Sequence, residues 1–91
     1  MMLNQKATKA FHFSRLGNKG LEFDPLAAQV AILDRTGRAI WTESQGEAPS
    51  PIRWMGIDST GKSVETGDYI CKIVYKDEKI AYLPFVFMKK D

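Results

Sequence analysis

The chain has 91 residues, of which 44% are hydrophobic and 26% are charged, a composition that excludes disordered, collagen-like and low-complexity proteins. A chain of this length builds one hydrophobic core. Its 13 basic and 11 acidic residues give a net charge of +2, and the two signs are interleaved, so the basic stripe typical of nucleic-acid-binding proteins does not develop.

Hydrophobic residues recur with a period of two in short runs separated by turn-forming residues, which is typical of β-strands. Residues 1–7 are predicted to form a flexible tail and residues 8–91 one domain. A first strand is expected over 11–14, where two phenylalanines alternate with His12 and a serine, and a turn is expected at 17–20.

Alternation resumes at 21–23 and continues in a strand over 28–32, whose even-numbered residues share one face. Asp34 and Gly37 then have the spacing of a tight turn, because an aspartate at the first position accepts backbone N–H groups and a glycine at the fourth tolerates the left-handed conformation. Residues 39–41 are predicted to return as the second arm of this hairpin.

An exposed loop is predicted over 44–51, followed by a short strand at 52–54. The Asp-x-x-Gly pattern recurs at 58–61. Gly67 is expected to allow a further turn, in which a glycine is needed if the turn has a positive φ.

The most regular strand covers 69–76 and its odd-numbered residues, including Cys71, are assigned to the core. A turn follows at 76–79, and the last strand is expected over 80–88. About seven strands with this spacing predict an all-β fold, an immunoglobulin- or fibronectin-III-like sandwich of two sheets.

A longer string of residues supports this fold: Val30-x-Ile32-x-Asp34-x-x-Gly37, and then Trp54-x-Gly56-x-Asp58-x-x-Gly61-x-x-Val64-x-x-Gly67-x-Tyr69. It resembles the Ig-like domain in the C-terminal half of the flagellar hook-capping protein, a module that also recurs in other bacterial secreted and envelope proteins. The resemblance implies a scaffold with a supporting role and no catalytic residues. The export and hook-attachment segment of the capping protein has no counterpart in these 91 residues.

The residues of this string also have physical roles that do not depend on the resemblance. Trp54 is expected to fill the space between the sheets, with Tyr69 packed beside its indole. Gly56 is expected to permit a bulge, and Asp58 and Gly61 to make a tight turn. The whole set is therefore predicted to be structural.

Few side chains have the chemistry of a catalytic or metal site. His12 is the only histidine and Cys71 the only cysteine, so an internal disulfide is impossible and zinc or nucleophilic catalysis is not expected. Asp34 and Asp58 offer oxygens to calcium, but without an Asp-x-Asp-x-Asp run they are expected to form turns. The sequence predicts no cofactor, no metal and no enzymatic activity.

The last strand is more apolar than a two-layer sandwich requires, because Tyr82, Val86 and Met88 add a second apolar face. Pro84 favours a position at a sheet edge. Two alternatives remain open: the N-terminal strand or the 44–51 loop covers this face, or a partner docks there.

The sequence therefore favours a non-catalytic interaction module of a bacterial assembly, related to the cell envelope, secretion or motility. It would engage a protein partner or a second copy through Tyr82, Pro84, Val86, Met88 and Trp41. The alternative is a carbohydrate-binding module in which Trp41 and Tyr82 stack on a sugar.

The sequence contains neither a signal-peptide pattern at its start nor an apolar run long enough to insert into a membrane. It predicts a cytoplasmic protein if these residues are the whole chain. It predicts a cell-envelope or extracellular module if they are part of a larger exported protein.

Overall fold

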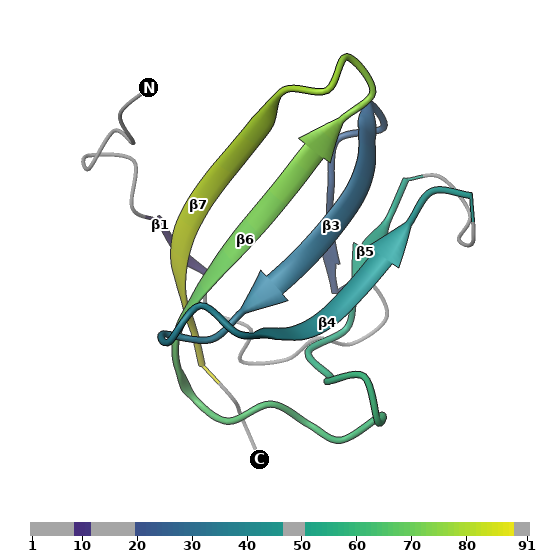
Figure 1. Cartoon of the computed structure of the whole chain (residues 1–91). Coiled ribbons are helices and arrows are strands. Elements are labelled where there is room, and N and C mark those ends of the chain that lie inside the picture. Colours follow the sequence, from purple (N-terminus) through teal and green to yellow (C-terminus); the bar gives the residue numbers. More distant parts are fainter. Residues whose placement is uncertain (1–8, 12–19, 47–50, 89–91) are drawn as a thin grey trace.

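A computed structural model describes residues 9–11, 20–46 and 51–88, and these residues form strands and turns without a helix (Figure 1). The all-β prediction is confirmed. The described strands are β1 (Lys9–Phe11), β2 (Leu21–Glu22), β3 (Ala27–Leu33), β4 (Ala39–Ser44), β5 (Arg53–Trp54), β6 (Gly67–Tyr75) and β7 (Ile80–Phe87). No helix in this part of the chain could therefore cross a membrane.

The strands form two sheets of unequal size, which confirms the two-sheet prediction. The larger sheet has five strands in the order β1-β7-β6-β3-β4, and the smaller pairs β2 with β5. Neighbouring strands run antiparallel, except that β1 lies parallel to β7. Figure 1 shows β7, β6, β3 and β4 as one twisted layer with β5 on one side of it.

The core lies between the two sheets and is made by the inward side chains of each strand. Trp54 of β5 and Ile52, which immediately precedes β5, are fully buried. The indole of Trp54 has its ring centroid 5.9 Å from that of Phe85 and 5.4 Å from that of Phe87. The other buried hydrophobic residues are Phe23, Ala27, Val30, Ile32, Val64, Cys71 and Ile73.

The alternation predicted for the long strands is confirmed in β6 and β7. Cys71 and Ile73 are buried in β6, as are Phe85 and Phe87 in β7. The beginning of β3 differs from the prediction, because the register with β6 shifts between Ala27 and Gln29. Through this irregularity Ala27 takes the buried position that the alternation assigned to its neighbour.

The last strand is not a free edge over its whole length, so the edge position predicted from Pro84 does not hold for the end of the strand. β1 pairs alongside β7, with Lys9 opposite Phe85 and Phe11 opposite Phe87. The N-terminal strand thus covers the last three residues of β7, and Pro84 immediately precedes this paired stretch. The predicted tail 1–7, most of the predicted strand 11–14 and part of the 44–51 loop lie outside the described residues.

Gly67 also departs from the prediction. It is the first residue of β6, and its φ is not in the positive region. A side chain added there would meet only a ring carbon of Tyr69 at 3.8 Å, an ordinary van der Waals contact. The left-handed turn expected at Gly67 is therefore absent, because the chain enters β6 there in an extended conformation.

Candidate protein-docking surface

The large sheet has a second face, directed away from Trp54, which we call the outer face. Its central residue is Lys72 of β6, which lies opposite Ala31 of β3 and opposite Tyr82 of β7. Because successive side chains of a strand alternate, this face contains the residues that the core does not use. They are Gln29, Ala31 and Leu33 of β3; Ala39, Thr42 and Ser44 of β4; Asp68, Ile70, Lys72 and Val74 of β6; and Ile80, Tyr82, Pro84 and Val86 of β7.

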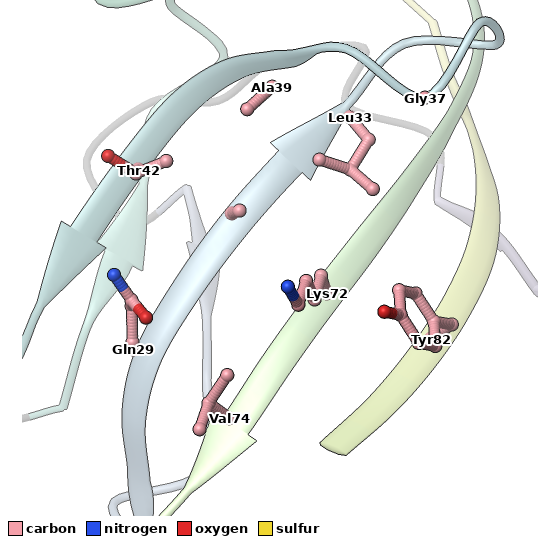
Figure 2. Close-up of a pocket in the computed structure, with 9 residues that line it drawn as sticks. Gln29, Leu33, Gly37, Ala39, Thr42, Lys72, Val74 and Tyr82 are labelled. Atoms are coloured by element: carbon pink, nitrogen blue, oxygen red, sulfur yellow. The ribbon is translucent and has the colours of Figure 1, made fainter.

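The outer face contains a hollow of about 410 Å³, which the sheet itself lines (Figure 2). The hollow has the volume of a small binding site. Aliphatic and polar side chains contribute equally to its lining. The aliphatic ones are Ala31, Leu33, Ala39 and Val74, the polar ones are Gln29, Thr42, Lys72 and Tyr82, and Gly37 completes the lining.

Lys72 is the only charged residue among those that line the hollow. The ion pairs between described residues join Arg53 to Glu22 and Lys79 to Asp77, so neither neutralises Lys72. In Figure 2 the hydroxyl oxygen of Tyr82 lies on the side of its ring nearer to Lys72. The hollow therefore combines aliphatic side chains with one cation, the hydroxyl groups of Tyr82 and Thr42, and the amide of Gln29.

The docking residues predicted on the last strand lie in and beside this hollow. The side chain of Tyr82 is 43% exposed, and Pro84 and Val86, on the same face, are half-buried. Ile80 is 52% exposed and lengthens the apolar row on this face. Met88 follows the end of β7 and is 39% exposed.

Trp41 does not belong to this surface. It lies opposite Ile32, which is fully buried, and its ring centroid is 6.4 Å from that of Trp54. Trp41 therefore packs toward the core, on the side of the sheet opposite to Tyr82. The docking set predicted from the sequence is divided between the two faces, and the two aromatic residues do not form one sugar-stacking platform.

Among the predicted structural residues, Trp54 fills the space between the sheets as expected, whereas Tyr69, which was expected to pack beside the Trp54 indole, has ring contacts with Phe85 and Phe87. The indole nitrogen of Trp54 donates a hydrogen bond of 2.8 Å to the carbonyl oxygen of Ile57. Gly56 is buried with a φ of 78°, and its carbonyl oxygen accepts a hydrogen bond from the amide of Val64. Burial raises the pKa of Tyr69, which packs against the core.

Two Asp-x-Thr-Gly turns lie next to each other at one end of the large sheet. In the second turn, Oδ1 of Asp58 accepts hydrogen bonds from the hydroxyl and amide of Thr60 and from the amide of Lys62. The hydroxyl hydrogen bond contributes most to lowering the pKa of Asp58. Asp34 has the same partners in its own turn, and its pKa is also lowered.

A second hollow, of about 270 Å³, lies between these turns. One carboxylate oxygen of each aspartate is already used by its own turn, which agrees with the structural role expected from the sequence. Within the described ranges, no three His, Cys, Asp or Glu side chains gather as a metal site would require.

The thiol of Cys71 is unsuited to nucleophilic chemistry. It is buried in the core, and this burial raises its pKa to about 12. The thiol therefore stays protonated near neutral pH, whereas the thiolate is the reactive form. His12 lies outside the described residues.

Gln29, Thr42 and Lys72 are the polar residues of the hollow that the sequence did not connect with function. Each is a polar residue at an outward position of a strand, which is the ordinary pattern of a solvated face. Alternation placed Lys72 away from the core, but it gave no sign that Gln29 and Thr42 lie on the same surface.

The comparisons with known proteins do not assign a family. No protein-family model matches the chain, and no curated protein matches it. A crystal structure of CopC from Methylosinus trichosporium OB3b aligns with a TM-score of 0.46 and 18% sequence identity, over 93% of this chain and 87% of that chain. The function therefore has to be argued from the outer face.

Proposed function

We propose that this protein is a non-catalytic interaction module that docks a protein partner on the outer face of its five-stranded sheet. The observation that carries the proposal is the apolar row of β7, in which Ile80 and Tyr82 are more than two-fifths exposed beside a hollow of the same face. Isolated exposed apolar residues are common, but a contiguous group around a concavity is typical of an interaction site.

The inner and outer faces of the large sheet have different roles, and this difference supports the proposal. The inner face buries a complete core around Trp54, so the apolar residues of the outer face are not needed to close it. β-branched and aromatic residues that contact water lower the solubility of a protein. A partner that covers them removes this contact with water.

The chemistry of the remaining groups supports a non-catalytic role. The carboxylates of Asp34 and Asp58 hold their own turns, and the thiol of Cys71 is protonated in the core. Membership in a motility or envelope assembly remains a hypothesis that rests on the resemblance of the Trp54 to Tyr69 string to the hook-capping domain.

The carbohydrate hypothesis required Trp41 and Tyr82 to act together, and the structure separates them on opposite faces. Only one aromatic ring, that of Tyr82, remains at the hollow. Stacking platforms for sugars and bases rely on the faces of exposed aromatic rings, so this geometry favours a protein partner.

The test is photo-crosslinking in cells of the native organism, with a benzophenone amino acid placed at position 82 or, as a control, at position 26. Leu26 is 60% exposed but does not line the hollow. We expect a protein to be crosslinked from position 82 only. Its purified form should bind the wild type and the Leu26→Ser variant equally, and the Tyr82→Ser variant at least tenfold more weakly.

Two results would contradict the proposed function. One is equal crosslinking from both positions, or equal binding of the partner to both variants. The other is a glycan that binds the wild type and is lost in the Tyr82→Ser variant while no protein is crosslinked.

A further inference from the structure

We infer that the partner is an apolar protein segment with a carboxylate side chain, which is held by Lys72 and the hydroxyl of Tyr82. This inference rests on the proposed function, since it names the chemistry that the outer face recognises. Charge complementarity carries it, because the hollow has one cation and no anion among its lining residues.

The position of Lys72 makes its charge decisive for the partner. It lies on the middle strand of the described face, opposite Ala31 on one side and Tyr82 on the other. Lys72 as a residue is half-buried, and a partner that covers the aliphatic floor also covers its ammonium group. Removing the water around an unpaired ammonium group is costly unless the partner supplies an anion.

The surrounding groups indicate how an anion would be held. Figure 2 draws the hydroxyl oxygen of Tyr82 on the side of its ring nearer to Lys72. Because the lysine side chain is flexible, its ammonium group would be able to turn toward a carboxylate that also accepts a hydrogen bond from Tyr82. Such charge-assisted hydrogen bonds are about twice as strong as neutral ones. The floor formed by Ala31, Leu33 and Val74 would take an adjacent aliphatic or aromatic side chain of the same segment.

A second copy of this chain fits the same surface poorly. Two outer faces packed about a two-fold axis through the hollow would place the two Lys72 ammonium groups close together, because an isologous interface joins a patch to itself. Like charges at the centre of an interface oppose association. A different protein with an acidic side chain avoids this repulsion.

The test is selection of random peptides displayed on phage against the immobilised wild-type protein, followed by binding of the individual peptides in solution. We expect the selected peptides to contain Asp or Glu beside a large apolar residue. They should bind the Lys72→Glu and Lys72→Gln variants at least tenfold more weakly than the wild type, the loss of one charged hydrogen bond. Selection against Lys72→Glu should enrich Lys or Arg in place of the acidic residue.

Lys62→Glu is the matched control, because it makes the same charge change at an exposed residue outside the hollow. The selected peptides should bind it as they bind the wild type. Circular dichroism shows whether each variant is folded. If Lys72→Glu is unfolded, the neutral Lys72→Gln variant replaces it in the binding test.

The outcomes separate this inference from the proposed function. Peptides that lose binding in Tyr82→Ser but show neither an acidic residue nor any dependence on Lys72 would overturn the inference alone. Dimerisation of the wild type that is lost in Tyr82→Ser, or a selection that yields no binder, would also overturn it. Peptides that bind Tyr82→Ser as tightly as the wild type would count against the proposed function as well.

Discussion

The hydroxyl of Tyr69 donates a hydrogen bond of 2.7 Å to the carbonyl oxygen of Glu65, four residues earlier in the chain. Tyr69 lies near the start of β6, so this bond ties the segment before the strand to the strand itself. The arrangement corresponds to the tyrosine corner of immunoglobulin-like sandwiches, where a tyrosine hydroxyl bonds to the backbone a few residues upstream. It also gives the ring of Tyr69 a fixed position beside Phe85 and Phe87.

We expect Tyr69→Phe to destabilise the domain by about 1 kcal/mol, because it removes one hydrogen bond and keeps the packing of the ring. Chemical denaturation of the purified variant measures this loss. Tyr82→Phe is the control, since Tyr82 is exposed on the outer face, and it should change the free energy of unfolding by less than about 0.5 kcal/mol. Equal effects of the two substitutions would argue against a structural role for the Tyr69 hydroxyl.

Trp54→Ala should destabilise the domain by about 3 to 5 kcal/mol, which is close to the whole stability of a domain of this size. The reason is that Trp54 is fully buried and contacts the rings of Phe85 and Phe87. Trp41→Ala should cost less, because Trp41 is only half-buried. A denaturant melt of Trp54→Ala with a loss below about 1 kcal/mol would be incompatible with this core.

Gly20 and Gly67 should respond differently to alanine. Gly20 has a φ of 62°, and a Cβ atom there would collide with the carbonyl oxygen of Trp54. We therefore expect Gly20→Ala to cost at least about 1 to 2 kcal/mol. Gly67→Ala should change the free energy of unfolding by less than about 0.5 kcal/mol. The backbone at Gly67 is extended, and a Cβ atom there would make only an ordinary van der Waals contact. Thermal melts of both variants measure the two losses of stability. A larger loss for Gly67→Ala than for Gly20→Ala would contradict this prediction.

Asp58 should make stability depend on pH at acidic values. Its pKa in the folded state is lowered from 3.8, chiefly by the hydrogen bond from the Thr60 hydroxyl. A lowered folded-state pKa contributes stability that is complete above the unfolded-state value and is lost as the pH falls through the folded-state value. Asp58→Asn keeps an oxygen acceptor in the turn but cannot ionise.

The Tm difference between the wild type and Asp58→Asn should therefore shrink as the pH is lowered from neutral to about 2.5. Circular dichroism melts across this range measure the difference. Asp34→Asn should show the same trend, because Asp34 makes the equivalent hydrogen bonds. A difference that stays constant with pH would show that the hydrogen bonds in the turn do not favour the ionised carboxylate.

Glu78 is the only non-glycine residue with a positive φ, 74°, in the described part of the chain. It lies in the turn between β6 and β7, where its amide donates to the carbonyl oxygen of Tyr75. Glu78→Gly should stabilise the domain by roughly 0.5 kcal/mol, because relief of the left-handed strain exceeds the added entropy of the unfolded chain. Lys76→Gly, where φ is not positive, should destabilise it in the same denaturation assay.

Which residues of the long strands face the core was determined by the sequence alone. The alternation of apolar and polar residues is a local property of a strand, so it placed Cys71 and Ile73 inside and Lys72 outside before any partner strand was known. The two Asp-x-Thr-Gly turns were equally local, because an aspartate carboxylate bonds within its own turn. The size and apolar character of Trp54 likewise marked it as a core residue.

The order of the strands and the composition of the outer face were decided only by the tertiary structure. Strand pairing joins segments that are distant in sequence and have similar patterns, so alternation is compatible with many orders and did not reveal the parallel pairing of β1 with β7. The register irregularity between Ile32 and Leu33 lets the neighbours Ile40 and Trp41 both pack against the core, which a strict period of two forbids. The same pairing brings Gln29 and Thr42 to the hollow around Lys72, and that surface exists only once the sheet has formed.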